Sequence, residues 1–232
     1  GLNDFFIMFK PRDIVSGDFY WYHKFDDSSQ IIVVGDCTGH GIPGALVSVI
    51  GSSLLNEIVK QRGIKGPSKI LDLLDVGVNR GLGNSVNTAD QRDGMDISIS
   101  YINPEKTKLK FAGAFRPLLL IRDGEMQEFK GDRFPIGGGD LYEKGNFNEM
   151  DITIEKDDSF YMFSDGFPDQ FGGPKGKKLM TKRFKETLQQ NIHLNFDEQC
   201  QALNSFINEW QGDLEQVDDV LVIGFSFPDQ ES

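Results

Sequence analysis

The sequence is poor in residues that bind zinc or form disulfides, with only two cysteines and three histidines among 232 residues. Cys37 and Cys200 stand far apart and in no CxxC spacing, which excludes a disulfide framework and a cysteine-based zinc site. No apolar run approaches the roughly 20 residues of a membrane-spanning helix, and no signal peptide is present. We expect a cytoplasmic domain that makes no membrane contact of its own, with tethering to a membrane sensor in the full-length protein as an open alternative.

Basic residues are also in the minority. Lys and Arg number 24 against 36 Asp and Glu, which gives a formal net charge of −12 at pH 7. Such a surface repels phosphate backbones and anionic lipid, so we expect no nucleic-acid partner.

The chain has enough apolar material for a sizeable core, with 38% hydrophobic residues and 19 phenylalanines. No repeat, low-complexity tract or linker divides it, so residues 1–232 are expected to form a single domain. Because the sequence begins at Gly1 without an initiator methionine, we expect the domain to come from a longer signalling protein with an upstream sensor domain.

The spacing of apolar residues predicts many short strands and two pairs of helices. Strands are expected at 5–10, 18–25, 30–36, 95–102, 108–113, 118–122, 125–129, 148–154, 159–164 and 220–227, and helices at 42–61, 68–79, 181–190 and 196–211. Asn195 with Glu198 has the pattern of a capping box, and Asp123-Gly124 that of a hairpin turn. Strands joined by short turns, with helices in pairs, indicate an α+β fold with antiparallel sheets covered by helices.

Aspartates stand where apolar strands meet a turn. They are Asp18 in VSGD, Asp36 in VVGD, Asp165 in MFSDG, and Asp218 with Asp219 in VDDV. Because side chains alternate between the faces of a strand, Asp36 continues the face of Val34, and Asp165 continues that of Phe163. Each apolar stripe therefore ends in a carboxylate at the rim of the core.

Several carboxylates at one sheet edge repel one another unless a cation neutralises them. Oxygen ligands favour Mg²⁺ or Mn²⁺. Asp218 and Asp219 lie on opposite faces of their strand, so one of the two must point inward. For any single Asp next to Gly, the alternative interpretation is that the two residues simply form a turn.

The segment GHGIPG at 39–44 matches the GxGxxG pattern of dinucleotide-binding sites. Two predicted helices and a loop separate it from the next strand, whereas that fingerprint requires a compact βαβ unit. The glycines are therefore interpreted as a tight turn beside Asp36, and His40 as a structural residue.

Six segments together resemble the SpoIIE-like branch of the PPM-type metal-dependent serine/threonine protein phosphatases. They are KPRDIVSGDFYW, VVGDCTGHGIPGAL, FAGAFRPLLL, FPIGGG, MFSDG and DDVLVIGF, in the order of that family and over nearly the whole chain. The resemblance implies a four-layer sandwich of two antiparallel β-sheets flanked by helices. It also implies bacterial signal transduction, with a phosphoprotein substrate such as an anti-sigma-factor antagonist, and direct attack of a metal-bound water on phosphorus.

The resemblance also implies a ligand set for two Mn²⁺ or Mg²⁺ ions. Asp36 would bridge the ions, the backbone carbonyl of Cys37 would be a further ligand, and Asp18 and Asp165 would hold one or the other ion. Asp218 matches the last ligand of the family, and Asp219 matches its neighbour. Asp36 and Asp18 are the residues expected to be essential for catalysis.

Three features stay open. Ala114 stands where some relatives carry an aspartate for a third ion, for which Asp93 or Asp96 is the alternative ligand. Arg12 is either a phosphate contact or a solvated charge at a strand end. The loop 166–178 is either a substrate-recognition segment or a disordered surface connection. The competing function is a catalytically silent regulatory module that binds a signalling partner through the same fold.

Overall fold

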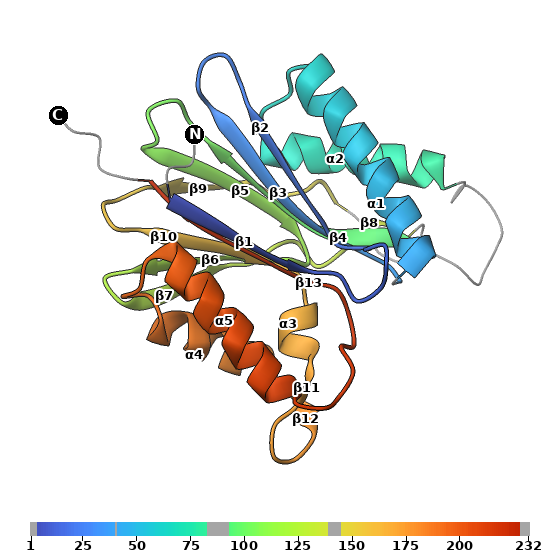
Figure 1. Cartoon of the computed structure of the whole chain (residues 1–232). Helices are drawn as coiled ribbons and strands as arrows, with labels where there is room; N and C mark the ends of the chain where they lie inside the picture. The colour runs from blue at the N-terminus through green and yellow to red at the C-terminus, as the bar shows by residue number, and fades with distance from the viewer. Residues whose placement is uncertain (1–3, 40, 83–92, 139–144, 228–232) are drawn as a thin grey trace.

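We describe a computed structural model of the chain, which covers residues 4–39, 41–82, 93–138 and 145–227. Two antiparallel sheets stack face to face, and helices cover both outer faces (Figure 1). The predicted α+β sandwich of four layers is therefore confirmed. His40 lies outside the described residues.

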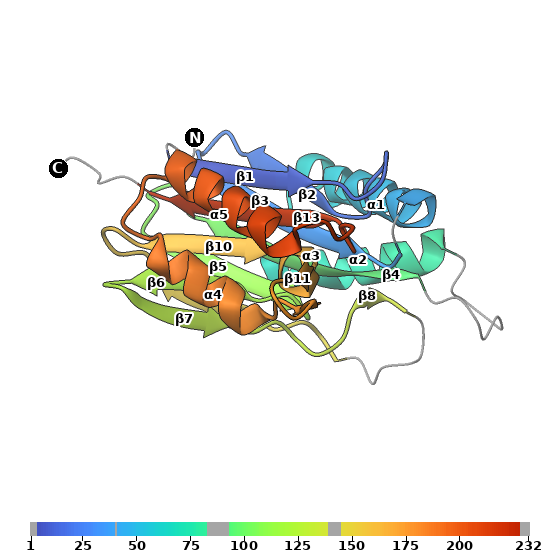
Figure 2. The same ribbon diagram turned by 60° about the horizontal axis from the view of Figure 1, so that its bottom comes forward.

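The five-stranded sheet has the order β1-β13-β10-β6-β7. Its strands are β1 (Asp4–Lys10), β13 (Val220–Ser226), β10 (Ser159–Phe163), β6 (Leu118–Arg122) and β7 (Glu125–Phe129). Helices α4 (Thr181–Gln190) and α5 (Phe196–Gln211) lie side by side over its outer face (Figure 2).

The six-stranded sheet has the order β2-β3-β4-β5-β9, and β8 pairs with β4. Its strands are β2 (Phe19–Lys24), β3 (Gln30–Cys37), β4 (Gly94–Ile102), β5 (Lys108–Ala114), β9 (Met150–Thr153) and β8 (Ile136–Gly137). Its outer face is covered by α1 (Gly41–Leu55) with the π-helical turn η1 (Asn56–Gln61), and by α2 (Pro67–Gly81). A short helix, α3 (Gly166–Asp169), and a small hairpin of β11 (Phe171–Gly172) and β12 (Lys177–Lys178) follow β10.

The inner strand β3 is apolar from Ile31 to Val34, as expected for a strand with both faces covered. Ile31 and Val33 pack under α1 and α2, whereas Ile32 and Val34 pack against the other sheet. This alternation places Asp36 on the face between the sheets, as the sequence predicts.

Two local predictions are also confirmed. Asn195 and Glu198 form a reciprocal capping box at the start of α5. Asp123 and Gly124 have φ values of 50° and 78°, which are the left-handed dihedrals that a tight two-residue hairpin requires.

The π-helical end of the first helix is not predicted by the sequence. Gly41–Gln61 forms one helix of 21 residues that is long and apolar enough, by length and composition only, to cross a membrane. This corrects the expectation that no stretch approaches that length, because the sequence pattern did not count the glycines and serines of this helix as part of an apolar run. Val47, Leu55 and Ile58 on its inner side belong to the core, while Leu46 and Val49 are exposed.

Candidate active site

Asp36 and Asp96 lie directly opposite each other on β3 and β4. Two carboxylates in this position repel each other. Arg116, from the turn after β5, offsets the repulsion, because its Nη2 lies 2.7 Å from Asp36 Oδ2 and 3.2 Å from Asp96 Oδ2. Phe115 has a φ of 57°, and this unusual dihedral for a non-glycine residue reverses the chain just before Arg116.

Asp165 joins this cluster from the other sheet. Its carboxylate Oδ2 lies 2.7 Å from Arg116 Nη2, and its backbone N–H donates to Asp36 Oδ2 at 3.3 Å. The segment after Asp165 can pack closely against Asp219 because residue 166 is glycine. A Cβ on Gly166 would lie 1.8 Å from the carbonyl oxygen of Asp219, so a side chain would push these two segments apart.

The position of Asp165 corrects the face prediction for this residue. Phe163 packs on the outer face of its sheet, under α4, whereas Asp165 meets Asp36 between the sheets. The reason is that β10 ends at Phe163, and Asp165 has helical dihedrals of φ −81° and ψ −12°. Strand alternation does not extend past the end of the strand.

Asp18 is held beside Asp36 by the buried carboxylate of Asp219. That carboxylate accepts hydrogen bonds from the backbone N–H of Arg12 at 2.7 Å and of Gly17 at 2.8 Å. Asp219 is thus the member of the pair that points inward. Asp18 itself is buried, and its Oδ2 has no hydrogen-bond partner among the described residues.

Burial is the main cause of the pKa shifts in this cluster. It raises the pKa of Asp18, and the charge of Asp36 raises it further. Burial likewise raises the pKa of Asp36, although Arg116 opposes the shift, and it raises the pKa of Asp96 to about 6. Burial lowers the pKa of Arg116, but the surrounding carboxylates outweigh this effect and raise it, so the guanidinium stays charged.

The donors at this edge fit a hard divalent cation, because they are carboxylates and a carbonyl rather than imidazoles or thiolates. The unpaired Oδ2 of Asp18 is a buried group that lacks a partner. The carbonyl oxygen of Cys37 lies in the same place, 3.3 Å from where a Cβ on Gly17 would stand. Among the described residues no three acidic, histidine or cysteine side chains surround one point as ligands do, and Arg116 is the cation that the carboxylates contact.

Burial and the neighbouring carboxylates raise the pKa of the Cys37 thiol well above its usual range. A thiol that stays protonated is a poor nucleophile, so the side chain of Cys37 is structural.

A cleft of about 410 Å³ opens beside Asp165. Its charged lining residues are Arg116, Lys130, Arg133, Glu128, Asp165 and Asp169. The lining thus has three cations and three carboxylates, and Arg116 among the cations is already paired with the site carboxylates.

The remaining predicted residues lie around this cluster. Asp218 accepts the N–H of Asp219 at 2.8 Å, and its charge raises the pKa of Asp18. Asp93 precedes β4, where its carbonyl accepts the N–H of Gly138. The guanidinium of Arg12 is exposed and donates to the carbonyl of Val217 at 2.8 Å.

Arg116 is the site residue that was not predicted from the sequence. It stands inside the segment FAGAFRPLLL, at the place where β5 turns toward β6. The available signal was a single arginine in the middle of this otherwise apolar segment, between two buried strands.

Two antiparallel sheets in a four-layer sandwich, with aspartates of both sheets meeting at one edge, define the class of PP2C-type protein serine/threonine phosphatase domains. The structure matches the SiaA PP2C domain of Pseudomonas aeruginosa with a TM-score of 0.84 and 33% identity, over 96% of this chain and 85% of that one. A structure of RsbX in complex with magnesium matches with a TM-score of 0.62 and 15% identity, over 95% of this chain and 92% of that one, which shows a common fold.

The sequence comparisons agree with this class. Phosphoserine phosphatase RsbP of Bacillus subtilis (strain 168) is 24% identical over 157 residues, which are 67% of this chain and 37% of RsbP. The family model of Stage II sporulation protein E (SpoIIE) matches residues 26–228. The chain belongs to the SpoIIE family, and it spans a little over a third of the length of RsbP.

Proposed function

We propose that this chain removes phosphate from phosphoserine or phosphothreonine in a protein substrate with the help of two bound Mn²⁺ or Mg²⁺ ions. The observation that carries the proposal is the meeting of Asp18, Asp36 and Asp165 from both sheets at one edge, with an unpaired oxygen on buried Asp18. The family supports the class of reaction.

The ligands would be the carboxylates of Asp18, Asp36, Asp165 and Asp218 and the carbonyl of Cys37. When bound, the two cations supply an activated water and offset the charge on the phosphoryl oxygens. The magnesium in the RsbX structure is consistent with this choice of ion. For a third ion, Asp96 is the better placed alternative, because it already faces Asp36, whereas Asp93 lies beyond the start of β4.

The protein residues have separate tasks in this proposal. Asp219 holds the backbone that presents Asp18. Lys130 and Arg133 line the cleft and would bind the phosphate dianion, while Arg116 would hold the site carboxylates. Arg12 is less well placed for this contact, because its guanidinium is tied to the carbonyl of Val217.

The biological setting is part of the same proposal. RsbP is called a phosphoserine phosphatase, and another matched structure joins RsbU and RsbW domains. We infer a phosphorylated switch protein of bacterial signalling as the substrate, such as an anti-sigma-factor antagonist. We also infer an upstream sensor domain in the full-length protein, with this domain in the cytoplasm.

The test is phosphate release from matched peptides that carry phosphoserine, phosphothreonine or phosphotyrosine, with Mn²⁺ or with EDTA. Release from the first two peptides, abolished by EDTA, is expected. Asp165→Asn should lower the rate about 100-fold, and Asp213→Asn, at an exposed position outside the cluster, should leave it unchanged. Equal rates with EDTA and with Mn²⁺ would contradict the proposal.

A catalytically silent module that binds a signalling partner is the second candidate. It is favoured by Arg116, whose guanidinium already offsets the charge of three site carboxylates. Mn²⁺ binding by calorimetry with no turnover of any phosphopeptide would support this second function.

A further inference from the structure

The β11–β12 hairpin is fixed to the body of the protein by Trp210 of α5. The indole N–H of Trp210 donates to the carbonyl of Gln170 at 3.0 Å, and the N–H of Gly173 donates to the carbonyl of Trp210 at 2.6 Å. A Cβ on Gly172 would lie 1.8 Å from that same carbonyl oxygen, so only glycine allows this close approach. The segment 166–178 therefore forms an ordered structure on α5 and is not a loose connection.

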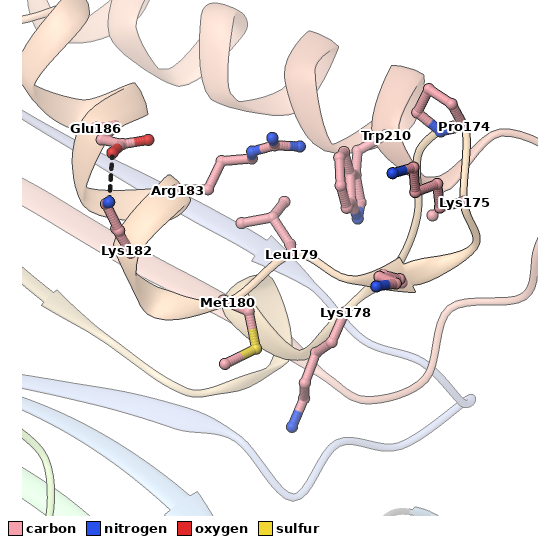
Figure 3. A pocket seen from close by; sticks show the side chains of 11 residues that line it. Pro174, Lys175, Lys178, Leu179, Met180, Lys182, Arg183, Glu186 and Trp210 are labelled. Atoms are coloured by element: carbon pink, nitrogen blue, oxygen red, sulfur yellow. Dashed lines mark ion pairs between the residues drawn. The ribbon is translucent and has the colours of Figure 1, made fainter.

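A groove of about 520 Å³ lies between this hairpin and α4 (Figure 3). Its charged lining residues are Lys175, Lys177, Lys178, Lys182, Arg183 and Glu186. Five cations therefore face one carboxylate on a chain whose net charge is −12. This local reversal of sign favours an anionic ligand.

Part of this positive charge is already balanced within the protein. Lys178 points away from Trp210 and pairs with Asp169 at 2.7 Å, and Lys182 lies 3.9 Å from Glu186 (Figure 3). Arg183 stacks over Trp210, with its guanidinium carbon 4.6 Å from the ring centre.

Lys175 and Lys177 are exposed and form no ion pair with any described residue. These two lysines, with Arg183 over its indole, are the charges that remain available to a ligand.

The groove lies next to the cleft beside Asp165. Asp169 lines the cleft and pairs with Lys178, which lines the groove. Thr181 lines the cleft, and the next residue, Lys182, lines the groove. A peptide whose phosphorylated residue occupies the cleft therefore has the groove as a neighbouring surface for the residues beside it.

We propose that this groove binds an acidic segment of the substrate protein, next to the phosphorylated residue. The proposal rests on the proposed phosphatase function. An Asp- or Glu-rich stretch fits the free lysines, and the apolar surfaces of Leu179, Met180 and Trp210 contact its side chains. A long nucleic acid is disfavoured, because the acidic protein around the groove repels an extended polyanion.

The test compares two labelled phosphoserine peptides, one flanked by Asp and Glu and the other by Asn and Gln at the same positions. Binding is measured by fluorescence anisotropy in EDTA, so that no turnover occurs. The groove variant is Lys175→Gln with Lys177→Gln. The control is Lys24→Gln with Lys108→Gln, which removes two exposed lysines from the six-stranded sheet. It has the same net charge as the groove variant.

The acidic peptide should bind the wild type more tightly than the neutral one, and the groove variant should weaken this binding about fivefold, as expected for two exposed ion pairs. The control should bind like the wild type. With Mn²⁺, the groove variant should raise KM for the acidic peptide by a similar factor and leave hydrolysis of para-nitrophenyl phosphate unchanged.

Equal affinity of the wild type for both peptides, an equal loss in the control, or tighter binding of a 12-nucleotide single strand than of the acidic peptide would overturn the groove proposal. Absence of all turnover with an intact preference for the acidic peptide would contradict only the phosphatase function.

Discussion

Replacing Arg116 by alanine removes the one cation that three site carboxylates share in the described structure. The side chain of Arg116 is only 13% exposed, so water replaces little of the lost interaction. Removal of one partner from a buried ion pair typically costs about 3–5 kcal/mol. We take the lower end, about 3 kcal/mol, because the side chain of Asp165 is 39% exposed and partly screened.

This loss is expected only when metal is absent. In EDTA, about 3 kcal/mol corresponds to a fall in Tm of roughly 6–12 °C for a domain of this size. With saturating Mn²⁺, the ions neutralise the same carboxylates, so the difference between Arg116→Ala and the wild type should shrink to below about 1 kcal/mol.

The assay is urea unfolding of the wild type, Arg116→Ala and Arg62→Ala, each in EDTA and in Mn²⁺. Arg62 is a suitable control because it lies 3.9 Å from Glu57 in a pair that is about half exposed, so its loss should cost no more than about 1 kcal/mol. If Arg116→Ala lost the same free energy of unfolding with and without Mn²⁺, the reasoning would be refuted, since the arginine would then stabilise the protein by packing and not by its charge.

Two further outcomes follow from the geometry. Gly166→Ala should lower both Tm and Mn²⁺ affinity, because its Cβ would lie 1.8 Å from the carbonyl oxygen of Asp219. The control Gly145→Ala should change neither, because no atom lies within 4 Å of the new Cβ. Burial and the neighbouring carboxylates raise the pKa of Asp18 from 3.8 to about 9, so its contribution to stability in EDTA is present below about pH 4 and is lost as the pH rises through about 9. In EDTA, the Tm of the wild type should therefore fall between pH 5 and pH 9, and the Tm of Asp18→Asn should change less. Parallel curves of Tm against pH for the two proteins would contradict the raised pKa of Asp18.

Strand alternation predicts the site only where a residue belongs to a strand. Asp36 is the seventh residue of β3, so its face follows directly from Val34. Asp165 stands two residues beyond β10 in a helical turn, and no periodicity in the sequence encodes that reversal.

The central role of Arg116 depends on pairing between distant segments, which the sequence does not reveal. Asp96 becomes a neighbour of Asp36 only because β3 and β4 pair in one particular register. Arg116 reaches both carboxylates only because Phe115 adopts a left-handed backbone conformation. The acidic half of the site was thus predictable from local motifs, and its internal cation was not.

The most direct test of a metal-dependent phosphatase centred on Asp36 is hydrolysis of para-nitrophenyl phosphate by the wild type and Asp36→Asn over a range of Mn²⁺ concentrations. We predict release that rises with Mn²⁺ to saturation in the wild type and is lost in the variant. Equal Mn²⁺-dependent release by both proteins would contradict the account.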